Sequence, residues 1–456
     1  MRISALRRHS LALALLPSVI VAHSVPARAQ RAAERDAPNE LERRIGRVST
    51  PVRTVELSAG TSDLRPLATL LGRASVVAYG ENTHGAHEPL AFRNRLFRHL
   101  VEELGFTAIA VETGLPESRR IARFVAGGPG APPPAEAARI ARESFTWGFG
   151  NFEENVELLR WMRAYNDDPG HPRKVRFYGM DLSLGGPQGS TPTPAAIEGA
   201  LAYLARVDPP VAEAIRTRVT PLLRHLPGGP SSTITAPERE ALTDVIDSLA
   251  TQLERGSATY VTRSGEEEYA WAVRNTEVAR QGDRVHRVQT SPSPGGGVSP
   301  GAWREVTARD SAMAENVRWV MQRERGRGRV LVFAHVMHVK NAPTVGGPWR
   351  FDRPPTVMGQ FLHRALGDSM IVIGSAGGGR AATMPGTIDA VLARVGRAPF
   401  LLDFRRARSD EHLLDWLNAE HPLGINGDAT ILLKPAAAFD AFVYFEALTP
   451  ARPNPR

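Results

Sequence analysis

The fold is constrained most strongly by four short apolar segments, each of which ends in an ionisable residue. The segments are Ser75–Glu81, Phe106–Glu112, Val175–Asp181 and Arg329–His335. Short runs of this kind are typical of strands that are buried on both faces. Between the first two, apolar residues recur every three or four positions from Phe92 to Leu104, which predicts an amphipathic helix. A strand–helix–strand unit of this length predicts a parallel pair of strands with a right-handed crossover.

These segments predict an α/β fold with a mostly parallel central sheet flanked by helices. Three later strand candidates are Met370–Ser375, Phe400–Phe404 and Ala441–Phe445. Between the third and fourth strands, from Pro194 to about His286, the pattern is helical throughout. We expect this helical insert to lie over the sheet edge as a cap.

The expected organisation of the 456 residues is one α/β domain interrupted by the insert. The boundaries are 1–29 for a signal peptide, 30–193 for the N-terminal part of the domain, 194–302 for the helical insert with a Pro/Gly-rich loop, and 303–456 for the C-terminal part.

Residues 1–29 have the pattern of an export signal. The first eight residues hold three Arg, an apolar stretch runs from Leu11 to Ala22, and Ala27-Arg28-Ala29 is a small-residue cleavage site. The apolar stretch is shorter than the ~20 residues that a membrane-spanning helix needs. We therefore expect an exported protein, periplasmic or secreted, with no stable membrane span and a mature N-terminus at Gln30.

Charge and cysteine content exclude several classes of protein. The formal net charge is +8, and it falls to +4 once the four Arg of residues 1–29 are removed. The remaining Arg residues are dispersed, so we expect no nucleic-acid partner. The chain has no cysteine, which excludes disulfides, thiolate zinc sites and a cysteine nucleophile.

The first strand leads into a loop rich in groups that carry out acid–base chemistry. Two carboxylates and two imidazoles occur within eight residues. Gly80 is expected to end the strand, and Pro89 suits the first turn of the following helix. His87 is interpreted as a helix-cap residue outside the core site.

The ionisable residues at the four strand ends are expected to meet at one edge of the sheet, because the strands are predicted to be parallel. They are Glu81 with His84, Glu112, Asp181, and His335 with His338. Charged groups are costly inside a sheet buried on both faces, but not at its rim. Open α/β sheets bind their ligands at this edge. The sequence therefore predicts an active site there.

Competing catalytic motifs lack essential parts. Ser375 is not in a G-x-S-x-G nucleophile turn, and His87 is not followed by the second His of an H-E-x-x-H motif. The glycines of Gly374–Gly379 lack the dinucleotide-binding spacing, and no phosphate-binding P-loop is present. A covalent serine mechanism and a nucleotide-driven mechanism are therefore both disfavoured.

Six motifs in a fixed order resemble the erythromycin esterase family. They are Gly80-Glu-Asn-Thr-His84-Gly85, Leu100-Val-Glu-Glu-Leu-Gly-Phe106, Val111-Glu112, Tyr178-Gly-Met-Asp181, Arg309-Asp-Ser-Ala-Met-Ala-Glu-Asn316 and Ala334-His-Val-Met-His338. The resemblance runs from about Ala68 to Leu448 and is weakest in the helical insert. It implies hydrolysis of a macrolide lactone ester without a covalent nucleophile. We expect no cofactor, with a divalent metal ion left as an alternative.

The resemblance also implies roles for individual residues. By position, His84 is similar to the general base of the family, with Glu81, Glu112, Arg93 and His335 as its catalytic companions. The chemistry agrees, because water must lose a proton to attack an ester and imidazole titrates near neutrality, with a reference pKa of ~6.5. A nearby carboxylate can orient the imidazole and stabilise its charged form.

Arg93 lies about one turn past Pro89 in the predicted helix. A permanently charged guanidinium there could bind the oxyanion that forms as the ester is attacked. The alternative for Arg93 is a surface ion pair with an acid.

Two further residues are candidates for substrate binding, His338 and Asp181. His338 lies three residues past His335 and could instead cap the turn. Asp181 could instead hold a histidine or order the end of its strand. Arg309 and Asn316 precede the fourth strand and could support the site from behind or pin their helix to the sheet.

Two alternatives to a metal-independent esterase stay open. The same His, Glu and Asp residues are a possible ligand set for a divalent metal ion. A related fold could also bind a ligand without turnover, because a fold does not determine a function. The expected partner is a small-molecule ester or lactone, and the sequence does not indicate an oligomeric state.

Overall fold

The computed structural model describes residues 38–182, 192–223, 225, 234–288, 298–347 and 350–454. The expected signal peptide, residues 1–29, lies outside the described residues, as does most of the expected Pro/Gly-rich loop. Within the described part of the chain, no helix is long and apolar enough to span a membrane.

The centre of the molecule is an eight-stranded sheet with the order β1-β7-β10-β6-β2-β5-β3-β4. Its strands are β1 (Thr50–Pro51), β2 (Val76–Glu81), β3 (Phe106–Gly114), β4 (Arg176–Asp181), β5 (Arg329–His335), β6 (Met370–Gly377), β7 (Phe400–Asp403) and β10 (Ala441–Phe445). The strands from β10 to β4 are parallel, whereas β7 runs antiparallel to β10 and β1. The expected mostly parallel sheet is confirmed, and the three later strand candidates are β6, β7 and β10.

The expected pairing of the first two apolar segments is wrong. β2 and β3 are parallel, but β5 lies between them, so that Leu331 pairs with Val77 on one side and with Ile109 on the other. Each of these strands is apolar enough to occupy a central position, so local sequence does not distinguish neighbours. The order has a functional consequence, because it places His335 between the ends of the strands that carry Glu81 and Glu112.

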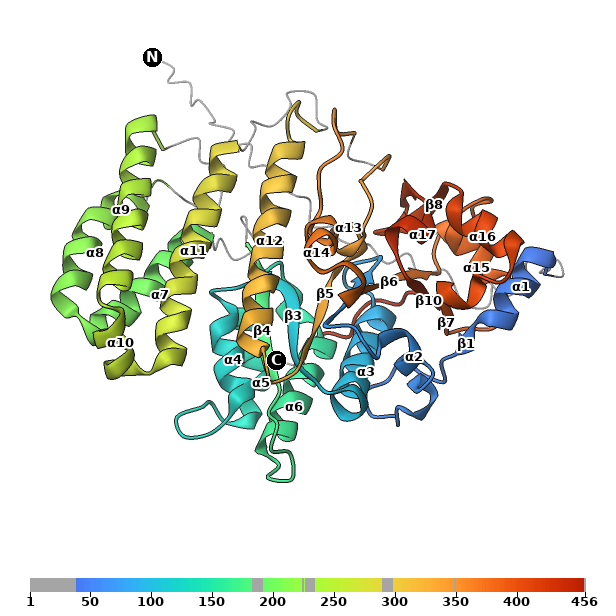
Figure 1. The fold of residues 1–456 in the computed structure, drawn as a ribbon, viewed down its shortest axis with the longest axis horizontal. Coiled ribbons are helices and arrows are strands. Elements are labelled where there is room, and N and C mark those ends of the chain that lie inside the picture. Colours follow the sequence, from blue (N-terminus) through green and yellow to red (C-terminus); the bar gives the residue numbers. More distant parts are fainter. Residues whose placement is uncertain are drawn as a thin grey trace, which may run out of the picture.

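Helices cover both faces of the sheet (Figure 1). Side chains alternate between the faces: Val76 and Ala78 belong to one apolar core, and Val77 and Tyr79 belong to the other. The core with Val77 is covered by α2 (Leu67–Leu71), α3 (His87–Leu104), α4 (Ser118–Ala126), α5 (Ala137–Ser144) and α6 (Glu153–Asp167). The core with Val76 is covered by α1 (Glu40–Val48), α12 (Trp303–Glu324), α13 (Val336–Val339), α14 (Met358–Leu366), α15 (Ile388–Ala393), α16 (Glu411–Asn418) and α17 (Pro435–Ala438).

Two glycines near the first strand have different roles. Gly80 does not end β2, which continues to Glu81. A Cβ at Gly80 would lie 2.9 Å from Val336 Cα, so this glycine lets α13 pack directly on the strand. Gly105 ends α3 in the left-handed conformation, with φ 70°, as its position after Leu104 predicts.

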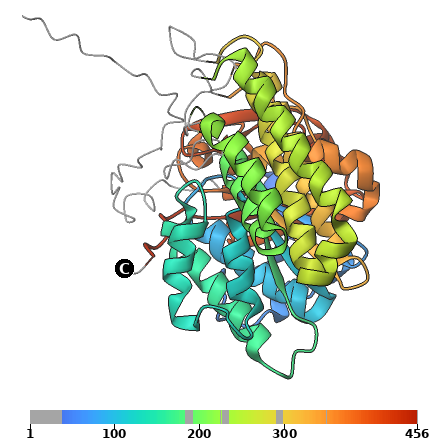
Figure 2. The ribbon, with the colours of Figure 1, turned by 90° about the vertical axis from the view of Figure 1, so that its left-hand side faces the viewer.

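The described residues between 192 and 288 form five helices on the β4 side of the molecule (Figures 1 and 2). They are α7 (Pro192–Val207), α8 (Pro209–Leu223), α9 (Ala236–Arg255), α10 (Ser257–Ser264) and α11 (Glu266–Val288). Their buried side chains continue the core that contains Val76. Their function as a cap stays a prediction.

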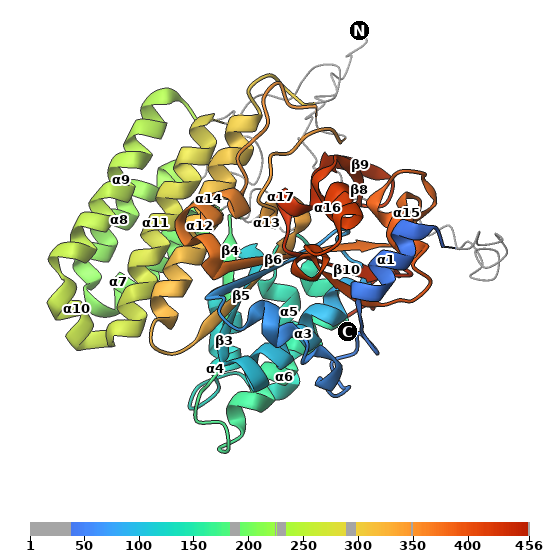
Figure 3. The ribbon, with the colours of Figure 1, turned by 45° about the vertical axis from the view of Figure 1, so that its right-hand side comes forward.

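A small antiparallel hairpin lies beside α15 (Figure 3). It consists of β8 (His421–Ile425) and β9 (Ala429–Leu433). This hairpin was not predicted, although Asn426-Gly427 is a strong hairpin signal. Both turn residues have positive φ, 44° at Asn426 and 86° at Gly427. The apolar residues of β8 and β9 are too few to stand out beside the long buried strands.

Candidate active site

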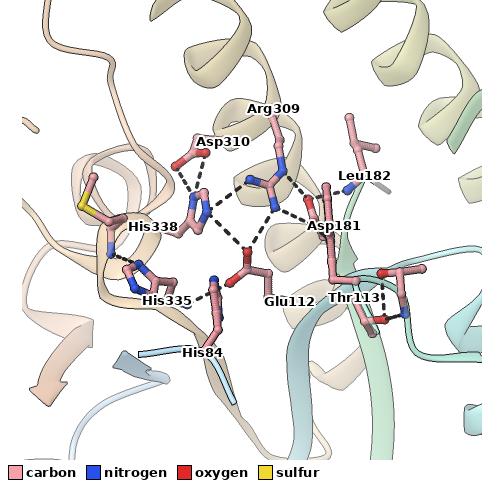
Figure 4. A network of polar contacts seen from close by, with 12 residues as sticks. His84, Glu112, Thr113, Asp181, Leu182, Arg309, Asp310, His335 and His338 are labelled. Atoms are coloured by element: carbon pink, nitrogen blue, oxygen red, sulfur yellow. Dashed lines mark hydrogen bonds and ion pairs between the residues drawn. The ribbon is translucent and has the colours of Figure 1, made fainter. Parts of the chain in front are cut away.

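The four strand ends predicted from the sequence meet at one edge of the sheet. Figure 4 shows His84, His335, Glu112 and Asp181 at this edge. Across the sheet their order is Glu81 on β2, His335 on β5, Glu112 on β3 and Asp181 on β4. β3 continues past Glu112 to Gly114 and shifts its register against β4 after Val111. Such irregularities re-aim side chains and are common beside active sites.

His84 and Glu81 form a pair at the end of β2. His84 Nδ1 lies 2.8 Å from Glu81 Oε1, and the imidazole is 35% exposed while the carboxylate is 3% exposed. Burial acts to lower the pKa of His84, but the hydrogen bond and the charge of Glu81 outweigh it and raise this pKa above its usual value. Burial raises the pKa of Glu81, against the opposing effect of His84. The partly exposed imidazole is therefore basic and is held at its Nδ1 atom by Glu81.

His335 is a neutral imidazole with a defined tautomer. Its Nε2 atom lies 3.1 Å from the carbonyl oxygen of Asn82, which can only accept a hydrogen bond. Its Nδ1 atom accepts a hydrogen bond of 3.3 Å from the backbone N–H of Met337. Burial, together with the neighbouring His84, lowers the pKa of His335 well below its usual value. The His335 ring centroid is 4.6 Å from that of His84, so it packs against the exposed imidazole while both of its nitrogens are engaged.

Glu112 lies at the centre of the site and is ionised. Its Oε2 atom accepts a hydrogen bond of 2.8 Å from the backbone N–H of His335. Its Oε1 atom accepts one of 3.1 Å from Arg309 and lies 3.4 Å from His338 Nε2. Burial acts to raise the pKa of Glu112, but the charges of His338, His84 and Arg309 hold it well below its usual value.

Arg309, on α12, joins the ends of β3 and β4. Two of its nitrogens donate to the two carboxylate oxygens of Asp181, at 2.9 and 2.6 Å. The guanidinium lies 5.2 Å from the Trp147 ring centroid, and Trp147 Nε1 donates a hydrogen bond of 2.8 Å to Asp181. The charges of Asp181 and Glu112 raise the pKa of Arg309 further despite its burial. The fork of the guanidinium is thus fixed in orientation.

His338 is the second cation beside Glu112. Its Nδ1 atom lies 2.9 and 3.0 Å from the two carboxylate oxygens of Asp310. Burial acts to lower its pKa, but the charges of Asp310 and Glu112 raise it to about 10. Arg309 Nη1 lies 3.2 Å from His338 Nε2, so two positive groups converge on one carboxylate (Figure 4).

Arg93 does not share the exposed face of the site. Its side chain is fully buried, and its Nε and Nη2 atoms donate to Asn94 Oδ1 at 3.0 and 2.7 Å. The guanidinium packs over the Phe333 ring at 4.7 Å, and burial lowers its pKa to about 10. From its buried position, the positive charge of Arg93 acts to lower the pKa of Glu81. A direct contact between Arg93 and a substrate would require the site to open.

His87 is turned toward other partners. Its two ring nitrogens lie 2.6 Å from Glu154 and 3.0 Å from Glu56. It is the first residue of α3, not the residue that caps it. The expectation that His87 lies outside the core site agrees with these contacts.

The sequence did not indicate that Trp147 and Phe149 line the site, and Arg309 was expected only to support the site from behind or to pin its helix to the sheet. Trp147 has φ 60°, which is rare for a bulky residue and is stored strain of the kind found at functional sites. The Phe149 ring centroid lies 5.3 Å from that of His84. Thr146 N–H donates to Thr113 Oγ1 at 2.8 Å, which ties the aromatic loop to β3. The available signal was the pair of aromatics beside Gly148, in a loop just before a predicted helix.

The carboxylates of the site are matched by cations, which bears on the metal alternative. Among the residues that the structure describes, no group of three or more His, Asp or Glu side chains is arranged to hold a metal ion. Glu112 and Asp181 already bind Arg309, whose permanent charge would repel a divalent cation. The donor set around Glu112 therefore does not fit a metal centre.

The chain is similar to a protein family, to a characterised enzyme and to solved structures. The erythromycin esterase family model matches residues 101–448. Erythromycin esterase type II from Escherichia coli is 26% identical over 328 residues, which cover 68% of this chain and 71% of that protein. A Bacillus cereus protein of known crystal structure has a TM-score of 0.73 at 23% identity, covering 91% of this chain and 98% of its own. A variant of the erythromycin esterase EreC in its open conformation has a TM-score of 0.60 at 18% identity, covering 89% of this chain and 98% of its own.

Proposed function

Because this chain belongs to the erythromycin esterase family, we propose that it hydrolyses a carboxylic ester or lactone by activating water with His84. Membership of the family makes it an esterase-like hydrolase, and the substrate and the mechanism are our proposal. The observation that carries the proposal is the His84–Glu81 pair, a partly exposed imidazole held at 2.8 Å by a buried carboxylate.

His84 acts as the general base. When its Nδ1–H donates to Glu81, the Nε2 atom has a free lone pair and can accept a proton from water. The imidazolium that forms is stabilised by the negative charge of Glu81, which is also why the pKa of His84 is raised. His335 packs beside the ring and, being neutral, adds no charge that would oppose protonation.

Arg309 and His338 supply positive charge for the developing oxyanion. Both side chains are partly exposed, 18% and 12%, and both are held in place by buried carboxylates. Donors that are fixed before the reaction stabilise a negative oxygen without reorganisation. Glu112 orients these two cations, and Asp181 orients Arg309. In this assignment Asp181 acts through Arg309, and Arg93 supports Glu81 from below.

A covalent serine intermediate is not part of the proposal. Ser375 is fully buried, and its Oγ atom is engaged with Asn82, at 2.8 Å from the backbone nitrogen and 3.2 Å from the side-chain oxygen. On a simple activated ester, direct attack by water predicts that the alcohol and the acid appear together, without an initial burst of alcohol. A burst of alcohol equal to the enzyme concentration would reveal an acyl-enzyme and contradict direct hydrolysis.

The substrate is proposed to be a macrolide lactone or a related ester. The test is incubation of the purified protein with macrolides of different ring size and with simple activated esters, followed by mass spectrometry. Hydrolysis adds one water to a lactone. Absence of turnover on every compound, by a folded protein, would favour the ligand-binding alternative.

The metal alternative has its own test. We expect activity to survive dialysis against a chelator and to show no dependence on added divalent cations. Loss of activity on chelation, with recovery on addition of one metal, would contradict the proposed mechanism. Elemental analysis of the purified protein is the matching control.

A further inference from the structure

The tip of the β8–β9 hairpin contacts the loop that carries His84. Asn426 N–H donates a hydrogen bond of 2.9 Å to the carbonyl oxygen of Asn82. The side-chain Oδ1 atom of Asn426 accepts one of 3.3 Å from the backbone N–H of His84. One residue thus binds two points of the catalytic loop, 342 positions away in the sequence.

These two contacts depend on the backbone conformation of the hairpin turn. Asn426 has φ 44° and the following Gly427 has φ 86°, both in the left-handed region. Asparagine and glycine are the residues that tolerate this region best. The turn directs both the N–H and the side chain of Asn426 toward the His84 loop, although the residue itself is exposed.

The hairpin is anchored to the sheet, so its tip has a defined position. Asp389, on α15, is buried and accepts hydrogen bonds of 2.7 Å from Gly424 N–H and 3.0 Å from Gly377 N–H. The first bond holds β8 and the second holds the end of β6. Leu423 and Ile425 are buried in the core beside them. A support built on anchored elements positions a site better than a free loop does.

The Asn82 carbonyl connects Asn426 to both histidines of the site. It accepts hydrogen bonds from Asn426 N–H and from His335 Nε2. Asn82 itself is buried and bound to Ser375 on β6. Asn426 is therefore in contact with the segment that sets the positions of His84 and His335.

We propose that Asn426 is a positioning residue that holds the backbone of His84, and with it the imidazole, in the orientation required for proton transfer. The inference rests on the proposed role of His84 as the base. It predicts that the Asn426 side chain affects turnover and the titration of His84 more than it affects substrate binding, since small displacements of a reacting group are costly.

Two substitutions separate the hydrogen bond from the fold of the turn. Asn426→Gly keeps the left-handed backbone and removes Oδ1, and we expect kcat to fall roughly ten- to hundredfold with KM little changed. Asn426→Asp keeps the acceptor and adds a negative charge near the imidazole. We expect it to retain kcat within about threefold at high pH and to raise the pKa of His84 in the pH–rate profile.

Asp428 provides a matched control in the same turn. Its side chain is 74% exposed, and its ion-pair partner, Arg380, is 4.0 Å away. Asp428→Ala truncates a side chain at the hairpin tip without touching the His84 loop. We expect it to leave kcat, KM and the pH profile unchanged.

An NMR titration of the His84 imidazole tests the inference without substrate. We expect an upward pKa shift in Asn426→Asp and no shift in Asp428→Ala. One outcome would contradict the positioning role alone. In it, His84→Ala is inactive, Asn426→Gly keeps the wild-type kcat, and His84 titrates in Asn426→Asp as it does in the wild type. The proposed function would then stand. If His84→Ala is active, the proposed function itself is wrong. If Asn426→Gly does not fold, the kcat of Asn426→Ala, which removes the same acceptor oxygen, decides.

Discussion

At the scale of single residues, the site is a balance of charges around two carboxylates. Glu81 raises the pKa of His84, and Glu112 accepts from Arg309 and faces His338. The pKa shifts of His84, Glu112 and His338 each have a charged partner at hydrogen-bond or ion-pair distance, whereas burial shifts the pKa values of Glu81 and Arg93. The chemistry of the site therefore depends on contacts that single substitutions can remove.

His84→Ala tests the base directly. We expect kcat to fall by the ~10²–10⁴-fold that is typical of lost acid–base catalysis, with little change in KM. In the wild type the active form of His84 is neutral, and its pKa is raised by Glu81, so kcat should rise with pH through an ionisation above the usual histidine value. Circular dichroism must show that the variant is folded. Near-normal turnover by folded His84→Ala would place the base elsewhere.

Glu81→Gln is the companion experiment on the same pair. The substitution removes the charge that raises the pKa of His84 and leaves burial, which lowers it. We expect the acid limb of the pH–rate profile to move to lower pH and kcat to decrease. An unchanged pH profile would mean that the titrating group is not His84.

Arg93 and Arg309 provide a second test, because both are arginines but only Arg309 is partly exposed. Arg309→Lys loses the two-pronged contact with Asp181 and should lower kcat strongly. Arg93→Lys loses buried hydrogen bonds to Asn94, so we expect a stability loss of about 1–3 kcal/mol, measured by denaturant unfolding, and a smaller effect on kcat. A large kcat loss in Arg93→Lys without a loss of stability would support the direct contact with the oxyanion that the position of Arg93 in the sequence suggests.

At the scale of elements, helices α7–α11 are joined to the sheet-covering helices by a cluster of ion pairs. Glu268, in the first turn of α11, contacts Arg119 and Arg123 on α4 and Arg206 on α7. The Arg119 guanidinium also lies over the Trp271 ring. Because Arg123 and Arg206 are half-exposed, these ion pairs add little stability, and the shared apolar core holds the helical group to the body of the protein.

Exchange of residues 192–288 for the matching helices of a relative tests the proposed cap. We expect the preference among macrolides to change while turnover of a small activated ester is retained, because the strand-end residues are not exchanged. The small ester is the control for folding and chemistry. If macrolide preference is the same before and after the exchange, the helices do not determine specificity.

At the scale of the whole molecule, the proposed destination is outside the cytoplasm. The expected cleavage after Ala29 predicts a mature protein that begins at Gln30. N-terminal sequencing of the protein recovered from the envelope or medium of a bacterial host measures this directly. Recovery of soluble cytoplasmic protein with an intact Met1 would contradict export. Replacement of Ala27 and Ala29 by larger residues is expected to block processing.

The sequence alone determined the α/β class and most of the residues that meet at the carboxyl edge of the sheet. Buried strands and amphipathic helices are local patterns, and parallel strands bring Glu81, Glu112, Asp181 and His335 to one edge wherever each strand lies in the order. Local patterns were less informative where a residue is required by a contact with a distant part of the chain. Gly80 is inside β2 because α13 packs on it, and the Asn426 turn was overlooked beside stronger strands.

Only the tertiary structure decided the strand order, the charge states and the supporting contacts. β5 lies between β2 and β3, which brings His335 against His84. Arg309 and Asn426 reach the site from distant segments. A pKa depends on burial and on charges a few ångströms away, so it cannot be read from a residue type. The sequence specifies which groups are available, and three-dimensional packing decides which of them are charged, exposed and in contact.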